Sequence, residues 1–136
     1  MKAIICDIDG VLIENPDWNG DLETFYKNIL DGVGNEWCIY LLKGLVLQGI
    51  KILFVTARNE RCRRQTKMQL DFWFGCRYEL FMRGEDDIRE DYLVKQDYID
   101  EIKRKYDVLF CIDDNPKNCE MFFKEFPTLH VLTNFS

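Results

Sequence analysis

Several features that would assign this sequence to a special class of protein are missing from it. Only three of its 136 residues are proline, and it contains no low-complexity stretch and no internal repeat. No uninterrupted apolar run approaches the ~18 residues that a membrane-spanning helix needs, so no contact with a membrane is expected. Because 47% of the residues are apolar and 14% are aromatic, the sequence predicts one globular domain over residues 1–136.

Signals of export and of structural zinc are missing as well. Residues 2–7 form an apolar run that ends in an acid and is too short for a signal peptide. The six cysteines form no CxxC pair, and the lone histidine, His130, cannot complete a zinc site of the usual spacing. We therefore expect a cytoplasmic protein with reduced cysteines, and a structural role for His130 in a late strand.

Positive charge is also in short supply. The 18 basic and 24 acidic residues give a net charge of −6, which argues against a broad, sequence-independent grip on nucleic acid through its phosphates. One local basic run stands out, and it consists of Arg58, Arg61, Arg63, Arg64 and Lys67. This run is either a solvated helix face or a groove for a phosphate backbone, and the sequence leaves both interpretations open.

What the sequence does contain is an alternation of apolar strands and amphipathic helices. Nearly continuous apolar runs predict strands at 2–7, 50–55, 78–82, 108–112 and 128–132. Helical patterns occupy 36–48, 59–74, 90–106 and 116–126; the first two stop at glycines and the last begins at a proline. This alternation predicts an α/β, Rossmann-like domain with a parallel sheet of about five strands and helices on both faces.

Polar residues follow the predicted strands at their carboxyl ends. In a parallel sheet these ends meet at one edge, which is where ligands bind. Asp7 and Asp9 follow the first strand, Thr56 the second, and Asp113 and Asp114 the fourth. Carboxylates packed this closely repel one another unless a cation neutralises them. Oxygen ligands without histidine or thiolate pairs point to Mg²⁺, so a magnesium site is expected at this edge.

The same residues carry a family resemblance. Asp7-Ile-Asp-Gly-Val11, Val55-Thr-Ala-Arg58, Lys95 and Ile112-Asp-Asp-Asn115 resemble, in order and spacing, the four motifs of the haloacid dehalogenase superfamily in its phosphatase branch. Taken singly, each motif also fits an ordinary turn, strand, helix cap or solvated helix charge. Four of them in order over nearly the whole chain are a specific signal. The acid at position 9 favours phosphoryl transfer over carbon–halogen cleavage.

The resemblance implies a role for each motif residue. Asp7 would be the nucleophile that attacks phosphorus and forms an aspartyl-phosphate. Asp9 would act as general acid and base and contribute its backbone carbonyl to the metal. Thr56 would hydrogen-bond the transferring phosphoryl group, and Lys95 would hold the nucleophile and the phosphoryl charge. The metal ligands implied for Mg²⁺ are Asp7, Asp9, Asp113 and Asp114.

A second resemblance concerns the substrate. The segment 81–95 is similar to the corresponding stretch of the 3′-phosphatase domain in bacteriophage-type polynucleotide kinases, where an arginine, an Asp-x-Arg-x-Asp step and the motif lysine occur at this spacing. A charged loop that leads into a solvated helix would have the same composition. The substrate-binding residues that the resemblance implies are Thr56, Ala57, Arg58, Arg83, Arg89 and Asp91.

The chain also departs from that enzyme. It lacks a GxxxxGK[ST] loop, so ATP-dependent phosphorylation is not expected. Residues 14–34 offer the only room for a cap, and a small or absent cap would leave the site open to a polymer end. Trp18, Phe25 and Tyr26 in this segment would either stack on a base or form the small core of the cap itself.

Three functions remain open at this point. The first is a Mg²⁺-dependent phosphatase that removes 3′-phosphates from DNA or RNA through an aspartyl-phosphate. The second is a phosphatase of mononucleotides or other small metabolites. The third is a binding module that has lost catalysis, which the complete set of motifs disfavours. The expected partner is a phosphorylated substrate, such as a nucleic-acid 3′ end or a nucleotide, and the sequence identifies no protein partner.

Overall fold

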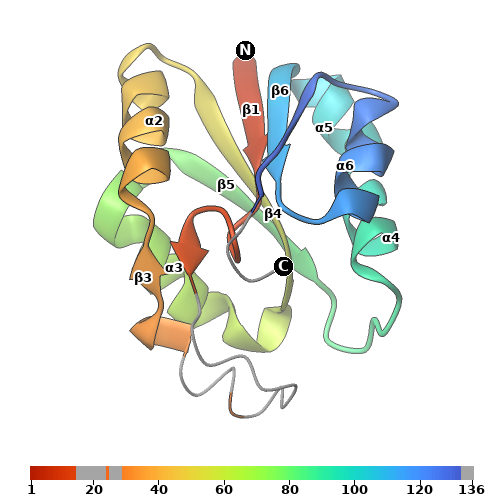
Figure 1. Ribbon diagram of the computed structural model, residues 1–136, viewed down its shortest axis with the longest axis horizontal. Helices are drawn as coiled ribbons and strands as arrows, with labels where there is room; N and C mark the ends of the chain where they lie inside the picture. Colours follow the sequence, from red (N-terminus) through yellow and green to blue (C-terminus); the bar gives the residue numbers. More distant parts are fainter. Residues whose placement is uncertain (15–23, 25–28, 133–136) are drawn as a thin grey trace.

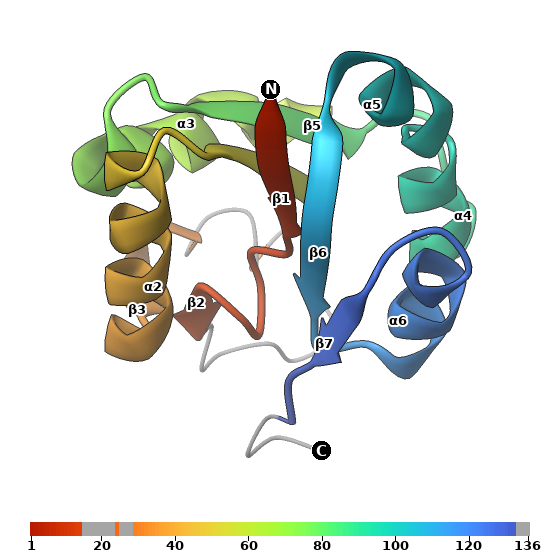
Figure 2. The same cartoon turned by 90° about the horizontal axis from the view of Figure 1, so that it is seen from above.

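A five-stranded parallel sheet with the order β5-β4-β1-β6-β7 forms the centre of the molecule. The computed structural model describes residues 1–14, 24 and 29–132. Helices α2 and α3 cover one face of the sheet, and α4, α5 and α6 cover the other (Figure 1, Figure 2). The predicted α/β architecture is therefore confirmed. The strands are β1 (Lys2–Cys6), β4 (Lys51–Asn59), β5 (Tyr78–Arg83), β6 (Asp107–Asp113) and β7 (Thr128–His130), and the helices are α2 (Glu36–Leu47), α3 (Arg63–Phe74), α4 (Asp91–Gln96), α5 (Ile99–Lys105) and α6 (Pro116–Phe123).

The central strand β1 shows why both faces of the sheet need helices. Its residues Ala3 to Cys6 are all buried, and successive side chains of a strand point to opposite faces. Ile4 and Cys6 pack into the core beneath α2 and α3, whereas Ala3 and Ile5 pack into the core beneath α5 and α6. A strand that is buried on both faces reads as a continuous apolar run, which is the pattern that the sequence has here.

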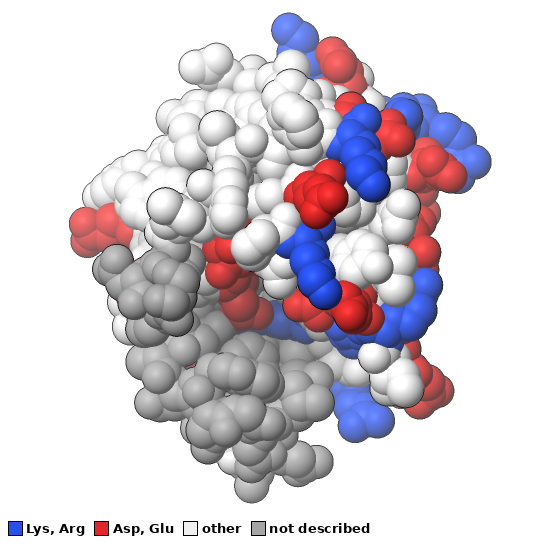
Figure 3. All heavy atoms as spheres, turned by 45° about the vertical axis from the view of Figure 1, so that its right-hand side comes forward, with Lys and Arg blue, Asp and Glu red and all other residues white. Residues whose placement is uncertain are grey.

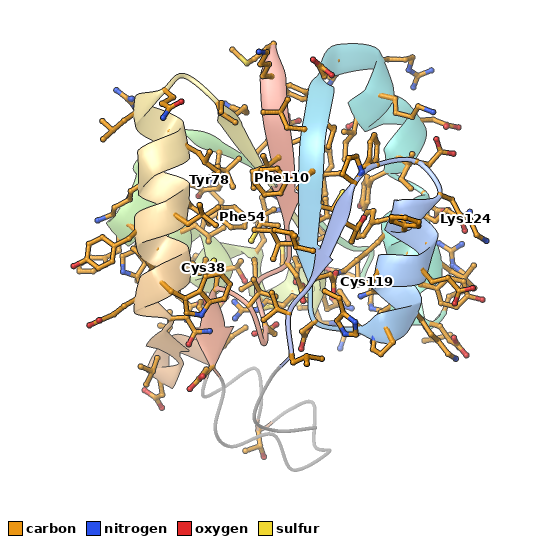
Figure 4. The ribbon with its side chains drawn as sticks, turned by 45° about the horizontal axis from the view of Figure 1, so that its top comes forward. Cys38, Phe54, Tyr78, Phe110, Cys119 and Lys124 are labelled. Atoms are coloured by element: carbon orange, nitrogen blue, oxygen red, sulfur yellow. The ribbon has the colours of Figure 1, made fainter. Side chains whose placement is uncertain are left out.

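Figure 4 shows side chains of these two cores on either side of the sheet. Cys38 of α2 points toward the sheet, where Phe54 and Tyr78 lie with their ring centroids 5.8 Å apart. On the other side, Cys119 of α6 faces the sheet and Lys124 points away from it (Figure 4). Burial raises the pKa of the Cys119 thiol to about 11, so this thiol stays protonated at neutral pH. All six cysteines are unpaired.

The second strand and the helix after it differ from the predicted boundaries. β4 continues to Asn59 instead of ending at residue 55, so Thr56 and Arg58 lie inside a strand. The extension pairs with β5 between Asn59 and Arg83, after a register irregularity. The chain then forms a 3-10 turn, η2 (Glu60–Cys62), in which the Asn59 side chain accepts from the Arg61 N–H. The predicted helix start at 59 was therefore wrong, because α3 begins at residue 63.

The single helix predicted at 90–106 is two helices, α4 and α5. The break falls before Tyr98, whose backbone N–H donates to the carbonyl oxygen of Lys95, three residues back. This turn places the Tyr98 ring 5.1 Å from the ring of Phe81, centroid to centroid, and its hydroxyl donates to the carbonyl oxygen of Met82. These contacts with β5 favour the break and hold α4 beside the sheet.

The two ends of the predicted cap segment, residues 14–34, are held together by backbone pairing. β2 (Ile13–Glu14) pairs antiparallel with β3 (Val33–Gly34), and a 3-10 turn, η1 (Ile29–Asp31), precedes β3. The Asn35 side chain then donates to the carbonyl oxygen of Val11, just before β2, at 2.6 Å. This two-stranded ribbon lies at the carboxyl end of the sheet (Figure 1).

The other part of the cap prediction cannot be placed on this framework. Base stacking and a small cap core were the alternatives for three aromatic residues of this segment. These residues, Trp18, Phe25 and Tyr26, lie outside the described part of the chain. In the described part of the chain, none of the helices has both the length and the apolar composition that a bilayer crossing requires.

Candidate active site

A buried lysine joins two strands at the carboxyl edge of the sheet. Asp7 directly follows β1, Asp113 is the last residue of the neighbouring strand β6, and Lys95 lies on the inner face of α4. Lys95 Nζ donates to Asp7 Oδ1 at 2.9 Å and to Asp113 Oδ2 at 2.7 Å. All three residues are buried. One ammonium group therefore holds two carboxylates from adjacent strands at the edge where the sequence placed the active site.

A third carboxylate completes a group that is suited to a cation. Oxygen atoms of Asp7, Asp113 and Asp114 all lie within 4.8 Å of one another. Carboxylate oxygens without nitrogen or sulfur donors fit Mg²⁺, which prefers hard oxygen ligands and retains several waters. The side chain of Asp9 is turned toward Arg58 instead, so its predicted contribution to the metal is through the backbone carbonyl. The donor set that the structure brings together thus fits the magnesium site expected from the sequence.

The electrostatics of this group show how strongly the carboxylates repel one another. Burial and the Asp113 carboxylate raise the pKa of Asp7 well above its usual value, although Lys95 works in the opposite direction. Burial also raises the pKa of Asp114. For Lys95, burial lowers the pKa, but the charges of Asp113 and Asp7 outweigh it and the net pKa is raised. One buried cation does not neutralise three acids, and a divalent cation would remove the remaining repulsion.

Gly10 is required at its position for two reasons. Its φ of +87° lies in the left-handed region, which residues with a Cβ rarely adopt. A Cβ at this position would also lie only 2.1 Å from Asp114 Oδ2. The glycine therefore permits the sharp exit from β1 and the close approach of Asp114 to it.

Asp9 is paired with Arg58, which the sequence had placed both in the basic run and among the substrate-binding residues. Arg58 Nε and Nη2 donate to the two Asp9 oxygens at 2.9 and 2.8 Å, the fork-to-fork geometry in which arginine binds carboxylates most specifically. The remaining nitrogen, Nη1, donates to Thr66 and Gln69 of α3. The Arg58 backbone N–H donates to Thr56 Oγ1 at 3.1 Å. Arg58 therefore lies buried beside Asp9 and not on an exposed basic face, because it belongs to the extended β4.

The loop between β5 and α4 is held by a dense hydrogen-bond network. Arg83 Nε donates to the carbonyl oxygen of Ala57, and Nη2 donates to Asp91 Oδ1. Its third nitrogen, Nη1, donates to the carbonyl oxygens of Asp87 and Arg89. The guanidinium of Arg89 in turn binds the Asp87 carboxylate at 2.8 Å. Arg83, Arg89 and Asp91 are thus brought together between the end of β5 and the start of α4, and both arginines are bonded to acceptors of the protein itself.

Three members of the basic run lie together on one side of α3, whereas Arg61 precedes this helix in η2. Arg63, Arg64 and Lys67, with Met68 and Asp71, line an open groove of about 520 Å³. Arg63 is bonded to a neighbouring glutamate, and the Lys67 ammonium lies over the ring of a β5 tyrosine. These three side chains thus line an open surface groove, and two of them already interact with other side chains of the protein.

Several residues that contact the site were missed in the sequence. Asn118 of α6 is buried and donates from Nδ2 to both oxygens of Asp113 at 3.3 Å. Thr66 and Gln69, which hold Arg58, also went unnoticed, since polar residues on a helix give no sign of burial. The start of α6 was the available signal for Asn118, because the Asn115 cap and the proline after it place Asn118 in the first turn of this helix, directly after β6. His130, which was expected to be structural, places Nε2 3.2 Å from the Asp114 carbonyl oxygen.

The fold and this site together define a class of enzyme. The parallel sheet carries Asp7, Asp113 and Asp114 at its carboxyl edge, with a buried lysine between them and a threonine on the next strand. This is the arrangement of phosphatases of the haloacid dehalogenase type. A D,D-heptose bisphosphate phosphatase from B. bronchiseptica, solved with magnesium and phosphate, shares this fold with a TM-score of 0.65 and 17% identity, over 98% of this chain and 82% of that one.

The family can be stated more closely. The model of the polynucleotide kinase PNKP phosphatase domain matches residues 1–131, and the chain belongs to this family. A protein of Autographa californica nuclear polyhedrosis virus, described as a bifunctional polynucleotide kinase/RNA ligase, is 30% identical over 118 residues, which are 85% of this chain and 17% of the viral protein.

Two solved assemblies contain chains of very similar structure. A chain of the Pnkp1/Rnl/Hen1 complex superposes with a TM-score of 0.85 and 29% identity, and one of the Pnkp1/Rnl/Hen1 RNA repair complex with 0.83 and 28%. Both matches cover 97% of this chain, but only 46% and 42% of the chains from the assemblies. The chain thus spans less than half the length of these relatives.

Proposed function

We propose that this chain is a Mg²⁺-dependent polynucleotide 3′-phosphatase that acts through an aspartyl-phosphate on Asp7. The observation that carries the proposal is the buried contact of Lys95 with Asp7 and Asp113. Removing three charges from water is costly, and replacing such groups by apolar residues is often neutral or stabilising for a fold. A catalytic role explains why these three charged residues are present. A phosphoryl group that arrives at Asp7 would have its negative oxygens close to a fixed cation, Lys95.

The reaction that these residues support has two steps. In the first, an Asp7 carboxylate oxygen attacks phosphorus, the ester bond from phosphorus to the leaving oxygen breaks, and Asp9 gives that oxygen a proton. In the second, a water oxygen attacks phosphorus while Asp9 takes its proton, and the bond from phosphorus to Asp7 breaks to release phosphate. Asp9 thus ends as it began, and one difficult step is divided into two easier ones. Thr56 and Lys95 hold the phosphoryl oxygens in both.

The metal has a defined place in this proposal. Asp7, Asp113 and Asp114 would hold Mg²⁺ through their side chains, and Asp9 through its backbone carbonyl. When bound, Mg²⁺ supplies positive charge to the phosphoryl oxygens and relieves the repulsion among the carboxylates. Burial and the repulsion from Asp113, which together raise the pKa of Asp7, support this role.

The polynucleotide substrate is supported by the family and by one surface. Relatives described as a polynucleotide kinase/RNA ligase and as part of an RNA repair complex suggest a nucleic-acid end, so we propose the 3′-phosphate of RNA or DNA. Over the face formed by α4, α5 and α6, basic and acidic side chains are interspersed (Figure 3). The groove on α3, lined by Arg63, Arg64 and Lys67, instead gathers positive charge where a nucleic-acid backbone could lie.

The proposal is tested by measuring phosphate release from a panel of substrates. The panel contains RNA and DNA oligonucleotides phosphorylated at the 3′ or the 5′ end, 3′-mononucleotides and sugar phosphates. We expect the highest kcat/KM for the 3′-phosphorylated oligonucleotides, with activity lost in EDTA and restored by Mg²⁺. Faster hydrolysis of mononucleotides or sugar phosphates would identify a small-substrate phosphatase, and full activity in EDTA would contradict the metal.

A further inference from the structure

Three buried polar side chains form a continuous hydrogen-bond chain behind Asp9. Arg58 Nε and Nη2 donate to Asp9, and Arg58 Nη1 donates to Gln69 Oε1 at 2.7 Å and to Thr66 Oγ1 at 3.1 Å. Gln69 Nε2 donates to the carbonyl oxygen of Ile29 at 2.6 Å. Arg58, Thr66 and Gln69 are each less than 10% exposed. The chain thus runs from the backbone of η1, through α3 and β4, to the side chain of Asp9.

The bonds of Nη1 fix how the guanidinium faces Asp9. A guanidinium is a rigid plane with five N–H donors, and a buried one is costly unless its donors are satisfied. With Nη1 held by two acceptors on α3, the plane cannot rotate about its long axis. The opposite edge, formed by Nε and Nη2, therefore presents its two donors to the Asp9 oxygens. The orientation of Asp9 is set by acceptors that never touch it.

Gln69 suits this position better than other side chains of similar size. Its amide accepts from Arg58 on one side and donates to the Ile29 carbonyl on the other, so only one of its two flip states satisfies both neighbours. A glutamate would lose the donor to Ile29 and would compete with Asp9 for the guanidinium. A leucine would leave a buried N–H of Arg58 and a buried carbonyl without their partners.

We propose that Gln69 is a positioning residue that holds Asp9, through Arg58, in the orientation required for proton transfer to the leaving oxygen. This inference rests on the proposed function, because it assigns to Asp9 the general-acid role. Gln69 itself does not contact the phosphoryl group. Its loss should therefore affect the proton transfer and spare the attack of Asp7 on phosphorus.

The leaving group separates this role from a merely structural one. An ester such as p-nitrophenyl phosphate has a good leaving group and needs little protonation, whereas a 3′-phosphorylated oligonucleotide has a poor one. We expect Gln69→Leu to lower kcat/KM for the oligonucleotide about tenfold or more, and for p-nitrophenyl phosphate by a clearly smaller factor. The ratio of the two values does not depend on how much of the variant is folded, because unfolded protein lowers both equally.

Gln65→Leu is the matched control. It makes the same change one turn earlier in α3, and Gln65 Oε1 has no hydrogen-bond partner among the described residues. The ratio of the two kcat/KM values should stay at the wild-type value in this variant. Thr66→Val, which removes the other acceptor of Nη1, should change the ratio in the same direction as Gln69→Leu. Adding Gln69→Leu to Arg58→Ala should change it no further, because the effect passes through Arg58.

Two outcomes would overturn the inference. One is an equal loss for both esters in Gln69→Leu; the other is a crystal structure of this variant in which the Arg58–Asp9 fork keeps its wild-type geometry. A wild-type protein that hydrolyses neither ester would instead overturn the proposed function. The crystal structure tests the positioning of Asp9 in that case too, so the two failures can be distinguished.

Discussion

Two ion-pair systems in this molecule have the same geometry and different surroundings. Lys95 Nζ lies 2.9 Å from Asp7 and 2.7 Å from Asp113, and none of the three side chains is more than 9% exposed. Lys103 Nζ lies 2.7 Å from Glu125, but these side chains are 47% and 40% exposed. Water and salt screen the surface pair, so it contributes little. The buried system requires the desolvation of every charge and becomes unfavourable when its one cation is removed. Burial, and not distance, distinguishes the two systems.

The arginines repeat this contrast. Arg58 and Arg89 each bind a carboxylate through two nitrogens, to Asp9 and to Asp87 respectively. Arg58 is buried against α3, whereas the Arg89 side chain is 45% exposed on a loop. The loop pair orders its own surroundings, and the buried pair orients a residue proposed to transfer protons. The predictions below test this division between buried and exposed charges.

The largest effect is expected where the buried charge is the reacting group. Asp7→Asn should lower kcat by about 10⁴-fold or more, because an amide cannot form the acyl-phosphate. Asp107→Asn, at the exposed amino end of β6, is the matched control and should leave kcat unchanged. Residual turnover near the wild-type rate in Asp7→Asn would contradict the nucleophile.

The same variant should be more stable than the wild type in metal-free buffer. Burial and Asp113 raise the pKa of Asp7 in the folded state, so the fold disfavours its ionised form. This cost is absent below the unfolded pKa of about 4, grows as the pH rises and is fully present above the folded pKa. At pH values where the wild-type group is ionised, the neutral amide avoids the cost. Thermal unfolding in EDTA should show a raised Tm at neutral pH and a smaller difference in acid.

The next largest effect concerns the buried cation. Lys95→Met should lower the free energy of unfolding in EDTA by about 3–5 kcal/mol, because it leaves buried carboxylates without their partner. It should also remove most of the phosphatase activity. Lys103→Met makes the same change in the exposed pair and should leave Tm and activity as they are. Chemical denaturation of both variants makes the comparison, and equal effects would show that burial does not separate the two pairs.

A pair of glycines sharpens the comparison without any change of charge. Gly10→Ala should destabilise the protein by about 1–3 kcal/mol, since it forces a strained φ and a clash with Asp114. Gly44→Ala on the outer side of α2 meets no atom within 4 Å and should stabilise the helix by about 0.5–1 kcal/mol. Activity should fall only for Gly10→Ala. A loss of activity in Gly44→Ala would mean that the surface of α2 takes part in function.

The smallest effect is expected from the exposed charges of the α3 groove. Arg63→Ala/Arg64→Ala should lower kcat/KM for a 3′-phosphorylated oligonucleotide by a few-fold. The kcat/KM for a 3′-mononucleotide should be almost unaffected. Each lost backbone contact should lower the slope of log affinity against log salt by roughly 0.7. The measurement compares both substrates at two salt concentrations. If the oligonucleotide has no advantage in the wild type and the variant changes neither substrate, the groove does not bind nucleic acid.

The parts that could be predicted from the sequence are those set by local pattern. The strands of the central sheet are buried on both faces, so their apolar runs were visible and their carboxyl ends located the acids. Asp7 and Asp113 could be expected to lie together because parallel strands end at the same edge. The fold and the meeting of these residues with Lys95 therefore followed from motif order and topology.

The rest depends on contacts between residues far apart in the chain. Arg58 was expected in the basic run and at the substrate, but its contact with Asp9, 49 residues away, was not foreseen, because it depends on the extension of β4 that directs the side chain inward. Gln69 and Thr66 look like ordinary polar residues of a helix, and only their position behind Arg58 makes them important. The break before Tyr98 results from its contacts with β5, which no local pattern encodes.

The central claim is that Asp7 carries the phosphoryl group, and trapping the intermediate tests it most directly. The protein is mixed with Mg²⁺ and a 3′-phosphorylated oligonucleotide, quenched during turnover and treated with borohydride, which reduces an acyl-phosphate to an alcohol. The account predicts that peptide mass spectrometry finds homoserine at position 7 in the wild type, and not without substrate or in Asp7→Asn. Turnover that leaves residue 7 as aspartate while another acid is reduced would contradict it.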